Sequence, residues 1–279
     1  MITMKRICCF ITLMGCMLLC MAQPQENPKT AILMVHFGTS EAQGRAKSLE
    51  AINADVKQAF PNIEVRQAYT STIVRNILKK QGLDYQSPLE ALTQLHDEGY
   101  ERVYVQSTTL MEGIEMKGIR DVVASMQASF KEIKAGNPLL YSVDDCRQVL
   151  NILTRQPLEG NQDVVLVGHG TSHPSTATYA MLQLMLDEQG LSAWHVSTIE
   201  GYPTQELTAQ HLQQRKPRKV LLIPLLLTAG DHANNDIAIE WKSFFEDKGY
   251  DVSVLLRGLG ELPEIRTLYI EHIKEMVNR

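Results

Sequence analysis

The sequence predicts an α/β fold of two similar lobes, each a mostly parallel sheet flanked by helices. Apolar strand patterns alternate with helical patterns along the whole chain. The strand candidates are continuous runs of β-branched and aliphatic residues, which is typical of strands buried on both faces of a parallel sheet. The first half of the chain also resembles the second in the order of its motifs. Together these observations predict two lobes that face each other across a cleft.

The first 22 residues are predicted to be a signal peptide. Lys5 and Arg6 precede an apolar run over 7–21, and the small residue Ala22 stands just before a polar stretch. The apolar run of about 15 residues is shorter than the roughly 20 that a membrane-spanning helix needs. We therefore expect cleavage after Ala22 and export to the periplasm. A lipoprotein anchored through Cys16 is the weaker alternative.

Net charge limits the partners that we expect for the mature chain, and cysteine content limits its disulfide bonds. Cleavage removes two basic and no acidic residues, so the mature chain has 25 basic and 32 acidic residues and a net charge of −7. Because no basic run is present, nucleic acid is not an expected partner. Cys146 is the only cysteine beyond the signal peptide, so no intramolecular disulfide is expected. A buried, unreactive thiol is the simplest role for it.

The predicted elements alternate along the chain as this fold requires. Strands are predicted at 31–36, 62–68, 102–107, 163–168, 193–198, 219–226 and 251–256. Helical patterns lie between them, for example at 41–59, 88–98, 174–189, 233–247 and 263–277. The predicted division is a signal peptide over 1–22, a first lobe over 23–140 and a second lobe over 141–279. The last helix is a candidate to pack back onto the first lobe.

The two halves share a frame but differ in the polar residues at their strand ends. Residues 31–40 match residues 163–172, with Gly-Thr-Ser in register. Each half then has a second strand that ends near a tyrosine and a third strand followed by a glycine loop. Aligning these glycine loops sets Glu115 of the first half opposite His232 of the second. The functional groups of the two lobes are therefore expected to differ.

The stretch V-V-L-V-G-H-G-T-S-H, residues 164–173, carries the clearest prediction of chemistry. A buried strand ends at Gly168-His169-Gly170, and the residues that follow predict the cap and first turn of a helix. In an open α/β sheet, ligands bind beyond the carboxyl ends of the strands. His169 is expected at that place.

Three residues of the second half, His169, Glu200 and His232, each follow one of three consecutive predicted strands. Two imidazoles and a carboxylate suit a first-row divalent cation with open coordination positions. Imidazole favours iron, cobalt, nickel or zinc over magnesium or calcium. The structural alternatives are a helix-capping carboxylate for Glu200 and an ordinary residue at a helix N-terminus for His232.

Structural or solvated roles are predicted for most of the other histidines. His96, His211 and His272 lie on polar helical segments, where a solvated side chain is expected. His195 lies inside a strand pattern, so a half-exposed side chain is predicted for it. His36 ends the first strand, so both a structural role and a functional role are open to it.

Other catalytic motifs fit the sequence poorly. The histidine phosphatase motif needs an arginine before its histidine, and Gly168 stands there. No G-x-S-x-G elbow of a serine hydrolase is present, and no G-x-G-x-x-G follows the first strand. A dinucleotide-binding fingerprint is therefore absent. The Gly-Thr-Ser runs at 38–40 and 170–172 would offer backbone N–H groups to an anion, which suits a carboxylate-rich ligand.

A series of motifs in a fixed order resembles one family. These motifs are H-F-G-T-S (36–40), A-Y-T-S (68–71), Q-S-T-T-L-M-E-G-I-E (106–115), G-H-G-T-S-H (168–173), E-G-Y-P (200–203), L-L-L-T-A-G-D-H-A-N-N-D (225–236) and G-L-G-E-L-P (258–263). The chain resembles the anaerobic-type sirohydrochlorin cobaltochelatases, class II chelatases related in fold to ferrochelatases. The resemblance covers residues 30–278, and T-A-G-D-H-A-N-N-D is its most specific part.

The resemblance implies a metal chelatase of cobalamin or tetrapyrrole metabolism. The implied reaction inserts Co²⁺, or Fe²⁺, into sirohydrochlorin or a precorrin-2-like tetrapyrrole and releases two protons. His169 and His232 match the family's metal-site histidines, and Glu200 matches its carboxylate ligand. Glu115 matches an acidic residue across the cleft. His169, His232 and Glu115 are thus the predicted catalytic residues.

Two positions depart from the family pattern. His36 stands where the family commonly has a small residue, so it would add a donor or cap the strand. Met116 stands where an aromatic residue often follows the acidic one, which bears on the contacts with the tetrapyrrole.

A mechanism follows as a hypothesis. Metallation removes two pyrrole protons and strips water from the cation, so a protein helps by aligning the metal with a bent ring. The three second-lobe residues would present Co²⁺. One histidine, with His169 favoured, would then release the metal and take a pyrrole proton. Glu115 would orient the ring or accept the second proton.

Export conflicts with a cytoplasmic pathway such as corrin synthesis, so two other functions stay open. One is a periplasmic carrier of haem or another tetrapyrrole, or a metal chaperone, on the same scaffold. The other is a metal-dependent hydrolase of small substrates. A homo-oligomer is also expected, because two-lobed domains with amphipathic terminal helices, here at 263–277, often pair.

Overall fold

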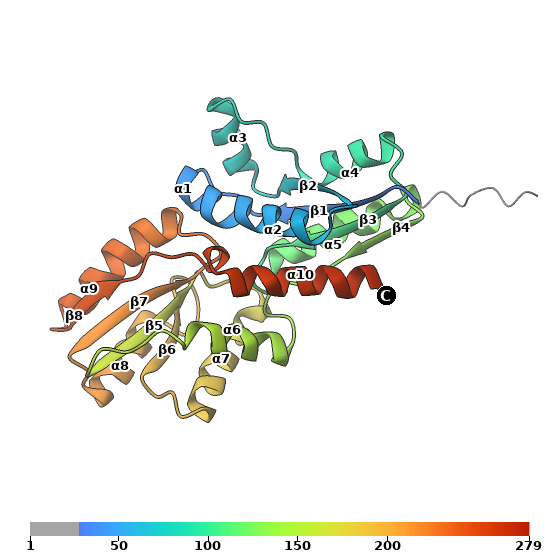
Figure 1. Cartoon of the computed structure of the whole chain (residues 1–279). Coiled ribbons are helices and arrows are strands. Elements are labelled where there is room, and N and C mark those ends of the chain that lie inside the picture. Colours follow the sequence, from blue (N-terminus) through green and yellow to red (C-terminus); the bar gives the residue numbers. More distant parts are fainter. Residues whose placement is uncertain (1–27, 279) are drawn as a thin grey trace, which may run out of the picture.

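The computed structural model describes residues 28–278 and has two four-stranded sheets flanked by helices (Figure 1). The predicted signal peptide over 1–22, with its four cysteines, lies outside the described residues. Within 28–278, no helix combines the length and the apolar character needed to cross a membrane.

The two sheets have the same strand order, and every strand pair is parallel. The first sheet has the order β2-β1-β3-β4, with β1 (Thr30–His36), β2 (Glu64–Tyr69), β3 (Arg102–Ser107) and β4 (Glu132–Ala135). The second has the order β6-β5-β7-β8, with β5 (Gln162–Gly168), β6 (Trp194–Thr198), β7 (Lys219–Leu225) and β8 (Asp251–Val254). The predicted two-lobed α/β fold is confirmed.

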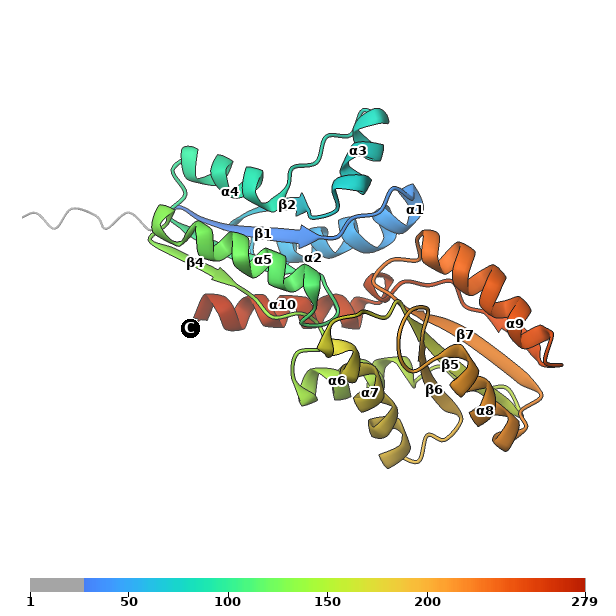
Figure 2. The same ribbon diagram turned by 180° about the vertical axis from the view of Figure 1, so that it is seen from behind.

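The helices cover both faces of each sheet (Figures 1 and 2). The first lobe contains α1 (Ala42–Gly44), the π-helix η1 (Arg45–Glu50), α2 (Ala51–Ala59), α3 (Thr72–Lys80), α4 (Pro88–Asp97), α5 (Ile114–Ser125) and the 3₁₀ turn η2 (Gln127–Ser129). The remainder of the chain contains α6 (Val143–Leu153), the 3₁₀ turn η3 (Pro174–Thr176), α7 (Ala177–Glu188), α8 (Gln205–Arg215), the π-helix η4 (Ala233–Trp241), α9 (Lys242–Glu246), the 3₁₀ turn η5 (Leu259–Glu261) and α10 (Pro263–Asn278).

The central strands are buried on both faces, as their unbroken apolar runs predict. All seven residues of β5 are buried, and so are the six residues of β1 after Thr30. Burial of a valine, leucine or isoleucine side chain stabilises the fold by about 1.5–3 kcal/mol. Strands with this pattern are therefore stable only between two layers of helices.

The edge strand β4 is missing from the sequence-based prediction. It has only four residues, Glu-Ile-Lys-Ala, and Ile133 is the one that is buried. A short edge strand of this kind has no apolar run to reveal it. Its pairing with β3, in which Arg102 lies opposite Glu132, defines it only in the folded sheet.

Helix α10 returns to the first lobe after the second sheet is complete, and both views show it running along that lobe (Figures 1 and 2). Its Tyr269 hydroxyl donates a hydrogen bond to the Thr108 carbonyl at 3.0 Å, and Arg266 pairs with Asp55 of α2. One cluster of buried apolar residues runs from β1 through α10 into α6 and β5. The apolar face of α10 is therefore used within the chain. Its amphipathic pattern gives no independent reason to expect a homo-oligomer.

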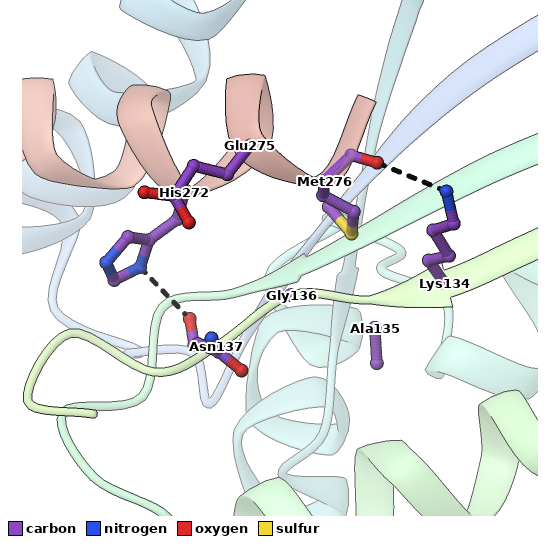
Figure 3. A pocket seen from close by; sticks show the side chains of 7 residues that line it. All are labelled: Lys134, Ala135, Gly136, Asn137, His272, Glu275 and Met276. Carbon is purple, nitrogen blue, oxygen red and sulfur yellow. Dashed lines mark hydrogen bonds between the residues drawn. The ribbon is translucent and has the colours of Figure 1, made fainter. Parts of the chain in front are cut away.

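His272 lies at the junction of α10 with both lobes, and the prediction of a solvated side chain for it is wrong. Its side chain is 9% exposed, with Nε2 at 3.0 Å from Asp145 of α6. Figure 3 shows its other contact, in which Nδ1 lies 3.3 Å from the Asn137 carbonyl. The Asp145 carboxylate and the Asn137 carbonyl can each accept a hydrogen bond from the ring. Lys134 donates to the Met276 carbonyl beside it.

The prediction of a half-exposed His195 is also wrong. Its Nε2 lies 2.8 Å from Asp163 Oδ2, and the Arg215 guanidinium donates to the same oxygen at 2.7 Å. Burial raises the pKa of Asp163, but the hydrogen bonds from His195 and Arg215 outweigh this effect and hold the pKa below its ordinary value. The cluster lies at the amino end of β5, so it stabilises the second lobe away from the predicted site.

The pairing of Asp145 with His272 predicts a pH-dependent contribution to stability. Burial raises the pKa of Asp145, but hydrogen bonds from His272 and Ser142 more than compensate, so the pKa is lowered. Asp145→Asn should lower the free energy of unfolding by about 1–3 kcal/mol at pH 7. Because the folded-state pKa is depressed, the wild-type advantage should be lost as the pH falls below about 3.9.

Urea unfolding at pH 7 and at low pH measures this difference. Asp144→Asn is the matched control, since its carboxylate is 83% exposed and pairs only at the surface with Arg147. The control should change stability by less than about 1 kcal/mol. Equal losses in the two variants would show that the junction contributes nothing specific.

Candidate metal site between the lobes

Two of the three predicted metal ligands lie side by side. The His169 and His232 rings have centroids 4.5 Å apart and planes at 86° to one another. His169 follows β5 directly, and His232 immediately precedes η4 in the segment after β7. Because β5 and β7 pair in parallel, with Gly168 opposite Leu225, both segments leave the same edge of the sheet. The strand register therefore brings together two residues that are 63 positions apart in the sequence.

The His169 loop is shaped by two close backbone approaches that exclude side chains. Gly170 has φ +90°, and a Cβ atom there would lie 1.5 Å from the Glu200 carbonyl oxygen. A Cβ on Gly168 would lie 2.3 Å from the Tyr179 ring. The Tyr179 hydroxyl accepts a hydrogen bond from the Gly170 N–H at 3.1 Å. His169 is thus held in a fixed position, and Tyr179 of α7 is a supporting residue that sequence reasoning missed.

The backbone of Glu200 lies next to that of His169. Its N–H donates to the His169 carbonyl at 2.8 Å, which continues the pairing of β5 with β6 past the strand ends. Its side chain is exposed. Among the residues that the structure describes, no group of three histidine, cysteine, aspartate or glutamate side chains is placed to hold a metal ion. The structure thus brings two of the three residues together, and Glu200 as a third ligand stays a prediction.

Hydrogen bonds at Nδ1 set the tautomers of both histidines. His169 Nδ1 lies 3.1 Å from the Gly170 carbonyl oxygen, and His232 Nδ1 lies 2.6 Å from Asp236 Oδ2. A carbonyl and a carboxylate can only accept, so each Nδ1 carries the proton. In the neutral ring, Nε2 then keeps its lone pair. Neutral imidazoles that bond through one nitrogen and offer the other are the usual form in which histidine binds a transition metal.

Glu115 lies at the corresponding edge of the first sheet. It is in the first turn of α5, and its carboxylate accepts a hydrogen bond from Thr70 at 3.0 Å. Thr70 directly follows β2. Glu115 is therefore held among the loops at the carboxyl ends of the first-lobe strands, and its catalytic role stays a prediction.

The loops at the carboxyl ends of the two sheets approach one another. A Cβ atom on Gly230 would lie 3.1 Å from Thr39 Oγ1 of the first lobe, and one on Gly113 would lie 3.5 Å from Ser175 Oγ of the second. The loop that precedes Glu115 and the loop that precedes His232 thus each contact the opposite lobe. Loops that adjoin the functional candidates therefore meet where the two lobes are in contact.

Met116 belongs to the interior of the first lobe. Its side chain has no exposed surface, and its sulfur accepts a weak hydrogen bond from Thr109 at 3.8 Å. Large apolar side chains that are exposed in the segments after the strands include Phe37, Ile114 and Tyr202. Met116 itself is therefore not available to contact a tetrapyrrole. The exposed apolar surface comes from these other residues.

His36 is a buried structural residue. Its Nδ1 lies 2.9 Å from Thr108 Oγ1 and its Nε2 lies 3.1 Å from Asn53 Oδ1, so both nitrogens are engaged. Burial lowers the pKa of His36 to about 4. Of the two roles that the sequence leaves open, the structural one holds, because a fully buried ring with both nitrogens bonded cannot bind a metal.

A pocket of about 240 Å³ lies apart from these residues. It is lined by the end of β4 and by α10, including Lys134, Asn137, His272 and Met276 (Figure 3). It contains none of the predicted site residues, so the chemistry is assigned from the histidine pair and not from this pocket.

The fold places the chain in a class of proteins that are built from two parallel α/β lobes. A solved structure of SirB from Bacillus subtilis with Fe³⁺ superposes with a TM-score of 0.66, at 18% identity, over 88% of this chain and 95% of that one. At this identity the likeness establishes the fold alone.

The family follows from the sequence comparisons. The model of the family described as cobalt chelatase (CbiK) matches residues 30–278. The sirohydrochlorin cobaltochelatase of Salmonella typhimurium is 35% identical over 257 residues, which cover 90% of this chain and 97% of that protein. The sirohydrochlorin cobaltochelatase CbiKC of Nitratidesulfovibrio vulgaris is 31% identical, covering 92% and 94%. The chain belongs to the cobalt chelatase (CbiK) family, which confirms the resemblance.

The buried His36 predicts a pH dependence of stability that is independent of metal. Its folded-state pKa of about 4 lies below the ordinary value of 6.5, so between these pH values the unfolded chain binds a proton that the folded chain does not. Stability should therefore fall as the pH drops from 6.5 to 4, by up to about 3 kcal/mol.

Urea unfolding of wild type and His36→Gln across this pH range tests the prediction. The variant should be less stable at pH 7 and should show a flatter dependence on pH. His96→Gln, which removes an exposed histidine of α4, is the control and should keep the wild-type slope. An unchanged slope in His36→Gln would contradict the assignment.

Proposed function

We propose that this chain is a sirohydrochlorin cobaltochelatase, which inserts Co²⁺ into a cyclic tetrapyrrole and releases two protons. The observation that supports this most directly is the His169–His232 pair, with both Nε2 lone pairs available, in a chain of the cobalt chelatase family. Imidazole nitrogen is a suitable ligand for cobalt and for the other first-row metals. Co²⁺ is a substrate of this reaction, and neither a nucleotide nor a redox cofactor takes part.

The two histidines are unequal, which supports a division of roles. A carboxylate at Nδ1 makes an imidazole a stronger donor than a carbonyl does, and only His232 has such a partner. His232 is therefore proposed to keep the metal while it is delivered. His169, whose Nδ1 bonds to a backbone carbonyl, is proposed to release it. Its Nε2 then accepts one pyrrole proton as a Co–N bond forms.

The second proton and the orientation of the ring are assigned to the first lobe. Glu115 is proposed to accept the second pyrrole proton or to orient the ring. Glu200, which belongs to the second lobe, is proposed to complete the metal coordination. Exposed apolar side chains at Phe37, Ile114 and Tyr202 supply surface for a planar macrocycle. The backbone N–H groups near Thr39 and Thr171 would meet its peripheral carboxylates.

Tetrapyrrole absorbance during incubation with sirohydrochlorin and Co²⁺ tests the proposal. His169→Ala and His232→Ala should each lower kcat/KM for insertion by about 100-fold or more, because each removes a ligand or a base. His96→Ala, on the exposed face of α4, should insert metal at the wild-type rate. Parallel assays with Fe²⁺ and Ni²⁺ define the metal preference.

Two outcomes would overturn the proposal. Wild-type rates in both histidine variants would show that the metal site lies elsewhere. Stoichiometric tetrapyrrole binding without turnover with any of the three metals would favour the alternative function, a carrier or metal chaperone on the same scaffold.

We also propose that the mature protein acts in the periplasm. The support is the sequence of residues 1–22, with its basic start, short apolar core and small residue at position 22. Fractionation should place the protein with periplasmic markers, and mass spectrometry should find Gln23 as its first residue. An acylated Cys16 at the N-terminus would indicate a lipoprotein, and an unprocessed Met1 in the cytosol would refute export.

A further inference from the structure

We propose that Asp236 is a positioning residue that fixes the tautomer of His232, so that Nε2 is the atom that binds the metal substrate. This inference rests on the proposed function for the identity of the metal. Its structural part, the orientation of the His232 ring, rests only on the contacts of these two residues.

The geometry places the two side chains in direct contact. Asp236 follows His232 by four positions, and residues at this spacing lie on the same side of a helix. Asp236 Oδ2 is 2.6 Å from His232 Nδ1. The Asp236 side chain is 25% exposed and the His232 side chain is 55% exposed, so the carboxylate is the more buried partner. The contact therefore ties an exposed ring to a more restrained group.

The restraint on Asp236 comes from the packing of η4. Ala233 and Ile237 have no exposed surface, and Trp241 is buried at the end of the same helix. Ile237 and Trp241 belong to the apolar cluster that covers β5 and β7. The backbone that carries Asp236 is therefore fixed to the sheet from which His169 and His232 emerge.

The chemistry of the contact determines which ring nitrogen is free. A carboxylate only accepts hydrogen bonds, so Nδ1 carries a proton, and in the neutral ring Nε2 then keeps the lone pair. A neutral histidine side chain in water favours the opposite tautomer, with the proton on Nε2. Without Asp236, the ring would have to change tautomer before Nε2 could bind a cation. Asp236 removes this step and holds the plane of the ring.

The Nδ1 partner of His232 can be removed by mutation, whereas that of His169 cannot. The partner of His169 Nδ1 is the Gly170 backbone carbonyl, which no side-chain substitution removes. Asp236 is the side chain that plays the equivalent part for His232. Its role can therefore be separated from that of the metal ligands themselves.

The test compares Asp236→Ala, the longer carboxylate Asp236→Glu, and Glu240→Ala as a matched control. Glu240 is an exposed acidic residue on the same helix, so its variant removes the same charge without touching His232. Nitrogen-15 NMR reports the His232 tautomer in the metal-free protein, with the signal assigned from His232→Gln. Titration with Co²⁺ alone, followed by its visible absorption, reports affinity.

In Asp236→Ala, the His232 signal should change from the Nδ1–H to the Nε2–H tautomer. Its Co²⁺ affinity should fall by about 10–100-fold. Asp236→Glu should recover part of both, and Glu240→Ala should match wild type. Circular dichroism and thermal unfolding show whether each variant is folded. If Asp236→Ala does not fold, Asp236→Glu serves as the test.

An unchanged tautomer or an unchanged Co²⁺ affinity in Asp236→Ala would overturn the inference. Loss of affinity in Glu240→Ala to the same extent would also overturn it, because a general charge effect would then explain the result. Wild-type protein that binds Co²⁺ through His232 but never inserts it would refute the proposed chelatase activity and leave the role of Asp236 intact.

Discussion

The register of β5 against its two neighbours is the constraint on which the site depends. Gly168 pairs with Thr198 on one side and with Leu225 on the other, so all three strands end at one edge. The backbone pairing continues past the strand ends, where Glu200 bonds to the His169 carbonyl. A shift of one residue would turn every β5 side chain to the opposite layer of helices and disrupt its packing on both faces. The energy of the buried sheet therefore fixes the geometry of the metal site.

The relation between the two lobes depends on α10. This helix belongs to the second half of the chain, yet its Tyr269 and Arg266 bond to the first lobe and its His272 bonds to α6. It shares one apolar core with both sheets. A change in its packing would alter the approach of the loops that carry Glu115 and His232. The positions of groups on opposite lobes thus rest on contacts made well away from the site.

Sequence patterns were sufficient for the features that depend on local composition. The buried strands follow from unbroken apolar runs, and the placement of His169 beyond a strand follows from the glycines around it. Patterns failed where a single long-range contact decides the outcome. The polar helix around His272 gave no indication that Asp145 and the Asn137 carbonyl would cover its ring. The strand β4 exists only because β3 offers it an edge.

By itself, the sequence determined the two-lobed α/β class, the family and the residues at the strand ends, because periodicity and motifs are local properties of the chain. Only the tertiary structure decided that His169 and His232 are in contact, that Asp236 holds the second ring, and that His36 is buried with both nitrogens bonded. These facts depend on strand register and on helix packing between residues far apart in the chain. No local pattern encodes such distances, because they result from the burial of the whole core.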